Sequence, residues 1–210
     1  MDDTLIRFFQ IPILLFSVVL HEITHGAVAL AFGDPTAKDQ KRLSLNPLRH
    51  LDLFGSIILP VTLLLLKAPP FGLAKPVPYN PFLLRKPRLG AVVVGIAGPV
   101  ANLVLAVVFA VGLRVVDAYG LAGFGQGGVA AAFALVIFVN LYLAFFNLIP
   151  IPPLDGSKLL YALIPDRYIK WKVFMERYGL FLFIIFIFQI ARYLSPLVYQ
   201  VFLFLTTYPL

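Results

Sequence analysis

The chain has 210 residues, of which 60% are hydrophobic and 13% charged, and its formal net charge is +7. A soluble domain averages about 45–50% apolar and about 25% charged residues, so this chain carries too few charges to cover a water-facing surface. It is also too apolar to be disordered. The absence of cysteine excludes disulfide scaffolds, thiolate metal sites and cysteine nucleophiles.

Long stretches with almost no charge predict membrane-spanning helices. They are residues 8–33, in which Glu22 is the single charge, 89–113, 118–154 and 193–210. Each approaches or exceeds the roughly 20 residues that cross the hydrocarbon core. Residues 178–191 form a shorter apolar run that can extend back to Trp171. We therefore predict an all-α polytopic membrane protein with about five to six transmembrane helices. Its single domain, 1–210, would comprise a catalytic core over about 5–163 and a C-terminal helical hairpin over about 170–210.

Basic residues gather in three segments and predict the orientation. The segments are 38–49, 67–88 and 158–177. The positive-inside rule places all three in the cytoplasm, with the N-terminus outside and the C-terminus inside. The short apolar run 53–66, broken by Pro60, lies between two of them and should make no net crossing. We expect a re-entrant or extended segment there, between the first and second full spans, packed against the other helices. The chain begins Met-Asp-Asp, so its first span is not preceded by the basic start of a signal peptide.

The first predicted span contains His21-Glu22-Ile23-Thr24-His25, the pattern H-E-x-x-H. Residues four apart share one face of a helix, so both imidazoles can bind one Zn²⁺. Glu22 lies about 100° further round the helix and could take a proton from metal-bound water. The alternative is a chance match or a purely structural set of polar residues. Because each ionisable group in a span costs at least ~2–3 kcal/mol, a metal site is the better interpretation.

Catalytic zinc usually takes three protein ligands, so a third ligand is expected outside this motif. His50 is one candidate, although it could equally be an interfacial histidine. Asp52 could enter with the short apolar run. Asp155 follows a proline-rich break at 150–153, which can unwind the third span and turn a carboxylate inward. The other role open to Asp155 is to cap the helix that follows it. We predict Asp155 as the ligand.

Two amides lie in predicted apolar helices and are candidates for substrate binding. Asn102 and Asn147 could hold an unwound substrate strand or stabilise the oxyanion of the reaction. Their alternative role is an interhelical hydrogen bond. Residues 72–81 could pair with a substrate strand by β-augmentation, or could be a packed connector.

An H-E-x-x-H motif in an apolar helix, followed by Asn-x-x-Pro-x-x-x-Leu-Asp-Gly at 147–156, resembles the site-2 protease family of intramembrane zinc metalloproteases. Further similar segments are 33–37, 45–52, 74–78 and 97–102. The resemblance implies that His21, His25 and Asp155 bind one zinc ion per chain and that Glu22 is the general base and acid. It also implies cleavage of a peptide bond in or near the transmembrane segment of a membrane-protein substrate. Some relatives carry a PDZ or CBS domain, and we expect neither here.

The expected setting is a multi-pass protein of the plasma or inner membrane, with its active site toward the cytoplasmic side. Its expected partners are transmembrane substrates and the lipid bilayer, and no nucleic acid. The alternative function is that of a non-proteolytic membrane zinc-binding protein or a metal transporter. A transporter more often shows inverted repeats and several acidic groups within the membrane, and neither is evident in the sequence.

Overall fold

The computed structural model describes residues 3–50, 75–119 and 128–206, and within them every regular element is a helix. The predicted all-helical class is thereby confirmed. The short apolar run 53–66 lies outside the described residues, as does most of the glycine-rich stretch before α5. The elements are α1 (Asp3–Ala31), α2 (Thr36–Asp39), η1 (Pro47–Arg49), η3 (Pro81–Leu83), α4 (Pro87–Ala118), α5 (Gly128–Asn147), α6 (Gly156–Leu163), η5 (Asp166–Tyr168) and α7 (Ile169–Thr206).

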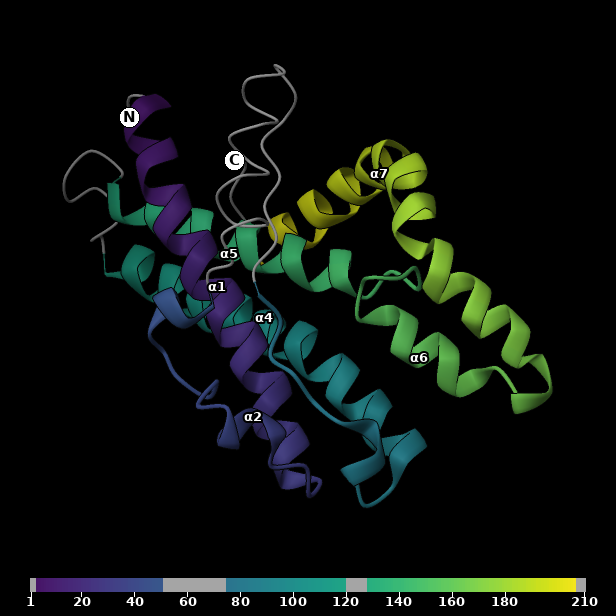
Figure 1. Cartoon of the computed structure of the whole chain (residues 1–210). Coiled ribbons are helices and arrows are strands. Elements are labelled where there is room, and N and C mark those ends of the chain that lie inside the picture. Colours follow the sequence, from purple (N-terminus) through teal and green to yellow (C-terminus); the bar gives the residue numbers. More distant parts are fainter. Residues whose placement is uncertain (1–2, 51–74, 120–127, 207–210) are drawn as a thin grey trace.

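Three helices in the described part of the chain are long and apolar enough to cross a membrane. They are Gln10–Ala31 of α1, all of α4 and all of α5. They correspond to the first three spans expected from the sequence. Figure 1 shows α1 crossing α4 and α5 at the centre of the molecule. The metal-site motif therefore lies in a helix that is packed against two others.

Glycine on α4 lets this helix approach its neighbours closely. A Cβ added to Gly98 would lie 2.5 Å from Nε2 of His25, and one added to Gly95 would lie 2.9 Å from Cβ of Lys158. Helices in a membrane associate through such close packing, because lipid supplies no hydrophobic force to drive them together. Glycines on one face of α4 thus let both α1 and α6 approach it closely.

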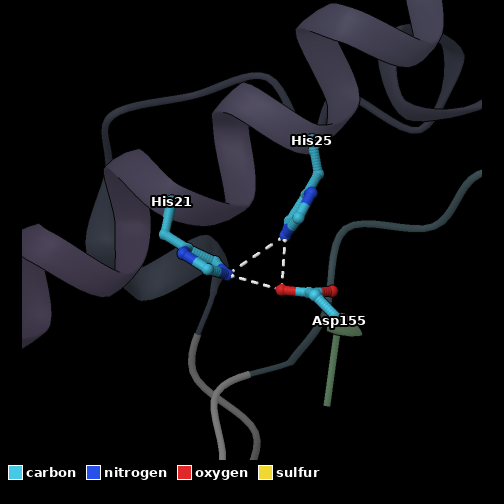
Figure 2. A group of neighbouring side chains, drawn as sticks. All are labelled: His21, His25 and Asp155. Atoms are coloured by element: carbon cyan, nitrogen blue, oxygen red, sulfur yellow. Dashed lines mark hydrogen bonds and ion pairs between the residues drawn. The ribbon is translucent and has the colours of Figure 1, made fainter. Parts of the chain in front are cut away.

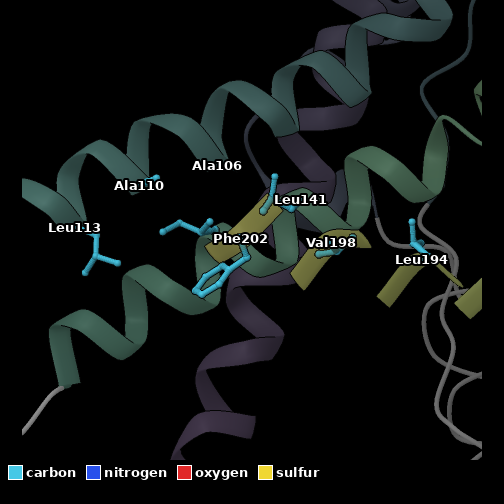
Figure 3. Close-up of a cluster of buried hydrophobic side chains, with 8 residues drawn as sticks. Ala106, Ala110, Leu113, Leu141, Leu194, Val198 and Phe202 are labelled. Carbon is cyan, nitrogen blue, oxygen red and sulfur yellow. The ribbon is translucent and has the colours of Figure 1, made fainter. Parts of the chain in front are cut away.

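A buried apolar cluster joins α4, α5 and α7 (Figure 3). Its members are Ala106, Ala110, Leu113, Ile137, Leu141, Leu194, Val198 and Phe202. Alanines on α4 face the larger side chains of the other two helices, which is how interlocking surfaces fill space without voids. The last part of α7 therefore belongs to the same bundle as the spans.

The C-terminal helix α7 is assigned as continuous over Ile169–Thr206, where the sequence led us to expect a hairpin. Figure 1 shows it bending so that its last part returns toward α5. Pro196 lies inside this helix and removes one of its backbone hydrogen bonds. In the first part of α7, Gly179 contacts Pro152, so this part packs against the proline-rich loop that carries Asp155.

Candidate metal centre

Three side chains from two distant parts of the chain meet at one point. Nε2 of His21 lies 3.0 Å from Nε2 of His25, and each of these nitrogens lies 3.0 Å from Oδ2 of Asp155. Both histidines project from the same face of α1 toward the carboxylate (Figure 2). The two rings are only 5% exposed. Among the residues that the structure describes, these three form the one His/Asp/Glu group placed to hold a metal ion.

The loop between α5 and α6 carries Asp155 to the histidines. Gly156 follows at a point where a Cβ would collide with the backbone carbonyl of Leu148, so the loop folds tightly on itself. Asp155 occupies the N-cap position of α6, but its side chain makes no capping hydrogen bond. Its Oδ1 instead accepts a hydrogen bond of 2.7 Å from Nζ of Lys158. The capping role that the sequence left open is therefore not the role of this carboxylate.

Lys158 keeps its charge beside Asp155. Burial lowers the pKa of this lysine, but Asp155, Tyr79 and Glu22 together outweigh burial and raise that pKa above its ordinary value. The ammonium also lies 5.2 Å from the centre of the Tyr79 ring, within the range of a cation–π contact. One oxygen of Asp155 is thus occupied by Lys158, and the other faces the two histidines.

The outer nitrogen of each histidine has its own hydrogen-bond acceptor. Nδ1 of His25 donates to the carbonyl of Val94 at 2.5 Å, and Nδ1 of His21 donates to Oδ1 of Asn102 at 2.6 Å. With the protons on Nδ1, both Nε2 atoms present lone pairs toward the Asp155 carboxylate. Three electron-pair donors so close together are stabilised by a cation between them.

These three donors fit zinc in type and spacing. Two histidines and one carboxylate form a known zinc ligand set of hydrolytic enzymes. Nitrogen and oxygen atoms ~2.0–2.1 Å from a tetrahedral Zn²⁺ would lie roughly 3.3 Å apart, and the observed separations are 3.0 Å. Small outward movements of the side chains would therefore open the site for the ion.

Glu22 lies beside this group but is not part of it. Its Oε2 accepts a hydrogen bond of 2.8 Å from the backbone N–H of Val77. Val77 belongs to an irregular segment, residues 75–80, at which the described part of the chain resumes after residue 74. Among the described residues, the glutamate that the motif offers as a base is therefore held by a main-chain donor.

The same irregular segment is tied to the end of α1 by a second carboxylate. Oδ2 of Asp34 accepts from the N–H of Asn80 at 2.5 Å, and its Oδ1 accepts from the N–H and hydroxyl of Thr36. Burial raises the pKa of Asp34, but these hydrogen bonds outweigh burial and lower that pKa below its ordinary value. Asp34 thus acts as an ionised anchor for segment 75–80.

The remaining candidates from the sequence lie in different surroundings. His50 is fully buried, and its Nε2 donates to the carbonyl of Ser44 at 2.8 Å. Asp52 lies outside the described residues. Asn147 donates at 2.9 Å to the carbonyl of Leu143 in its own helix. Neither His50 nor Asn147 belongs to the group formed by His21, His25 and Asp155.

Asn102 makes the interhelical hydrogen bond that the sequence left open as its second role. Its amide nitrogen donates to Oδ1 of Asn140 at 2.7 Å, and Nδ2 of Asn140 donates to the hydroxyl of Ser17 at 2.9 Å. Ser17 and Asn140 were not among the residues expected from the sequence. The available signals were a hydroxyl one helical turn before His21 and an amide in the middle of an otherwise apolar helix.

Comparisons with known proteins agree with this geometry. Residues 115–188 match a model described as peptidase family M50. The chain is 43% identical to "Putative zinc metalloprotease YwhC" of Bacillus subtilis over 175 residues, which cover 82% of this chain and 76% of the relative. It is 32% identical to "Putative zinc metalloprotease Rip2" of Mycolicibacterium smegmatis over 142 residues, covering 68% of this chain and 52% of the relative.

A third relative is "Zinc metalloprotease MJ0392" of Methanocaldococcus jannaschii. The identity is 29% over 157 residues, which cover 74% of this chain and 34% of that relative. No solved structure gave a significant match.

Proposed function

The chain belongs to peptidase family M50, the site-2 protease family, and on this premise we propose that it is an intramembrane zinc metalloprotease. Its reaction is hydrolysis of a peptide bond in or near the transmembrane segment of a membrane-protein substrate. The observation that carries this proposal is the meeting of His21, His25 and Asp155 beside Glu22, on a helix long and apolar enough to cross a membrane.

In this proposal His21, His25 and Asp155 hold one zinc ion per chain. The Asp155 carboxylate lowers the net charge of the site, because two neutral imidazoles leave the full charge of the ion uncompensated in a poorly solvated place. Lys158 holds the second carboxylate oxygen, which favours binding through Oδ2 alone. A zinc ion held by these three residues would supply Lewis acidity for the hydrolysis.

Glu22 acts as the general base and acid. It takes the proton of the water that attacks the scissile carbonyl and passes it to the leaving amine. The Val77 N–H occupies Oε2, so Oε1 is the oxygen that moves the proton. Val77 is buried, and its N–H holds Oε2 in place. The carboxylate therefore keeps its direction while its protonation state changes.

The substrate must present an extended peptide at this site. A helix hides its amides in backbone hydrogen bonds, so a transmembrane substrate has to unwind locally before cleavage. We propose that Asn147, which is only partly buried and directly precedes the Asp155 loop, contacts this unwound strand. Asn102 is fully buried and hydrogen-bonded to His21, so it is not placed to contact the substrate.

The topology completes the proposal. The two parts of α7 serve as further spans beside α1, α4 and α5, and a re-entrant or extended segment lies between the first two full spans, all within one domain. The site then opens toward the cytoplasmic side of the plasma or inner membrane, from which water reaches it. The charge distribution supports this orientation. The partners are transmembrane substrates and lipid.

Glu22→Gln tests the catalytic role. The substitution keeps the size of the side chain and an oxygen for the Val77 N–H, but removes the basicity. We expect proteolysis to fall by about 10²–10⁴-fold, while the purified variant keeps its zinc. Quantitative proteomics of a strain that carries the variant should reveal uncleaved membrane substrates.

Near wild-type cleavage in Glu22→Gln would refute the assignment of the base. If the chain binds zinc, but the wild-type and variant strains contain the same membrane peptides, the non-proteolytic alternative would be supported instead. The family membership does not favour that alternative.

A further inference from the structure

A line of buried polar side chains runs behind His21 through three helices. It consists of Asn102 on α4, Asn140 on α5 and Ser17 on α1, which are 0%, 0% and 4% exposed. The line begins where Asn102 Oδ1 accepts from His21. Asn102 then donates to Asn140, and Asn140 donates to Ser17. Amides inside apolar helices are costly unless they are paired, and in this line each amide is paired at both ends.

Backbone carbonyls fix the orientation of both amides. Nδ2 of Asn140 lies 2.9 Å from the carbonyl of Val136, which can only accept a hydrogen bond. The nitrogen of Asn140 must therefore face Val136 and Ser17, and its oxygen must face Asn102. Asn102 in turn must present its nitrogen to Asn140, and the same nitrogen lies 3.4 Å from the carbonyl of Ser17. The oxygen of Asn102 is left facing His21.

This orientation decides where His21 carries its proton. An amide oxygen can only accept, so Nδ1 of His21 must donate and Nε2 keeps its lone pair for a metal ion. Asp155 acts in the opposite direction, because Oδ2 at 3.0 Å would favour a proton on Nε2. A proton on Nε2 would block the position through which the ring binds zinc.

We propose that Asn140, acting through Asn102, is a positioning residue that holds His21 in the tautomer with its proton on Nδ1 and thereby sets the zinc affinity of the site. The inference rests on the proposed function for the identity of the metal. It goes beyond that function by assigning the control of a ligand to a residue that touches neither the ligand nor the substrate. The competing explanation is that the line of amides only holds α1, α4 and α5 together.

The first test reads the tautomer directly in wild-type protein. The chain has three histidines, so zinc-free protein labelled with 15N-histidine in detergent micelles gives three rings to assign at about pH 9, well above the usual histidine pKa of ~6.5. We expect Nδ1 to carry a proton in His21 and His25. His50 is the internal reference for the other tautomer, because its Nε2 donates to a carbonyl.

The second test uses matched amide variants and zinc itself. Asn140→Leu and Asn102→Leu remove the amides with little change in size, and Asn102→Asp restores an oxygen toward His21. Thr206→Val is the control, since Thr206 is a buried polar residue whose hydroxyl donates within its own helix, α7. In competition with a chelator, we expect both leucine variants to bind zinc about 10–100-fold more weakly. Asn102→Asp should recover most of this loss, and Thr206→Val should match wild type.

The outcomes separate the inference from its alternatives. A wild-type His21 that carries its proton on Nε2 alone would overturn the inference, even if no variant folds. Leucine variants that keep the Nδ1 proton and the wild-type zinc affinity would overturn it as well. Weak zinc binding without any change of tautomer, and without recovery in Asn102→Asp, would assign the amides a structural role only. A wild-type chain that binds no zinc would refute the proposed function while leaving the tautomer measurement to decide the inference.

Discussion

Gly98→Ala should destroy the metal centre by adding a single methyl group. The new Cβ would lie 2.5 Å from Nε2 of His25 and 2.6 Å from Nε2 and Cε1 of His21, where ordinary contacts begin at 3.4 Å. Relief requires the two rings to retreat by roughly 1 Å, whereas zinc sites hold their ligand distances within ~0.2 Å. Overpacking costs about 1–3 kcal/mol, and the helix itself gains about 1 kcal/mol from alanine. The fold should therefore survive while zinc binding fails.

The assay compares zinc content, zinc affinity and cleavage of a membrane substrate in Gly98→Ala, wild type and Gly112→Ala. Gly112 lies on the same helix, and its added Cβ would approach the edge of the Phe133 ring at 3.0 Å, a contact that a small ring movement relieves. We expect the control to keep its zinc. We expect Gly98→Ala to lose at least about 10²-fold in activity, as a 1 Å displacement of catalytic groups commonly causes. Wild-type zinc affinity and activity in Gly98→Ala would refute the reasoning.

Three further predictions test the ligand set, the topology and a carboxylate anchor. Asp155→Ala should lose tightly bound zinc and Asp52→Ala should keep it when the metal content of both purified variants is measured; the opposite result would make Asp52 the third ligand. Cysteines introduced at Arg85 and Arg88 should react only with membrane-permeant reagents, and labelling by an impermeant external reagent would overturn the proposed orientation. Asp34→Asn should lower the unfolding free energy by roughly 1–3 kcal/mol near neutral pH. Because the folded pKa of Asp34 lies below its unfolded value, this difference in stability should be complete above about pH 4 and should shrink as the pH falls further. A stability difference that does not change with pH would show that the ionised carboxylate of Asp34 is not its cause.

The two histidines could be placed from the sequence because their relation depends on one helix alone. Four residues along a helix return to the same face, whatever the rest of the fold does. Asp155 needed a longer argument, from the proline-rich break before it and from the need for a carboxylate. Its backbone does occupy the capping position that was the alternative, so only the direction of its side chain in the folded chain separates the two roles.

The amides behind His21 could not be interpreted in the same way. Asn102 is 81 residues from His21 in sequence, and Asn140 is a further 38 residues along the chain. Whether such residues meet depends on the rotation and height of packed helices. A helix as uniformly apolar as α5 carries no polar face from which that rotation could be predicted. Asn102 and Asn147 both lie in apolar stretches of the sequence. Asn102 nevertheless bonds to another helix, whereas Asn147 bonds within its own helix.

The hydrogen bonds of residues 75–80 also carry a consequence for register. The amides that bond outward belong to Lys75, Val77 and Asn80. The intervening prolines, Pro76 and Pro78, have no N–H to offer. A slip of this segment by one residue in either direction would set a proline opposite Glu22 and leave the carboxylate without its donor. Each of these bonds is donated by a main-chain N–H of the segment, so the bond to Glu22 does not itself use the side chain of Val77, which is buried and lies close to Gly26. The proline spacing therefore fixes the register of the segment against Glu22.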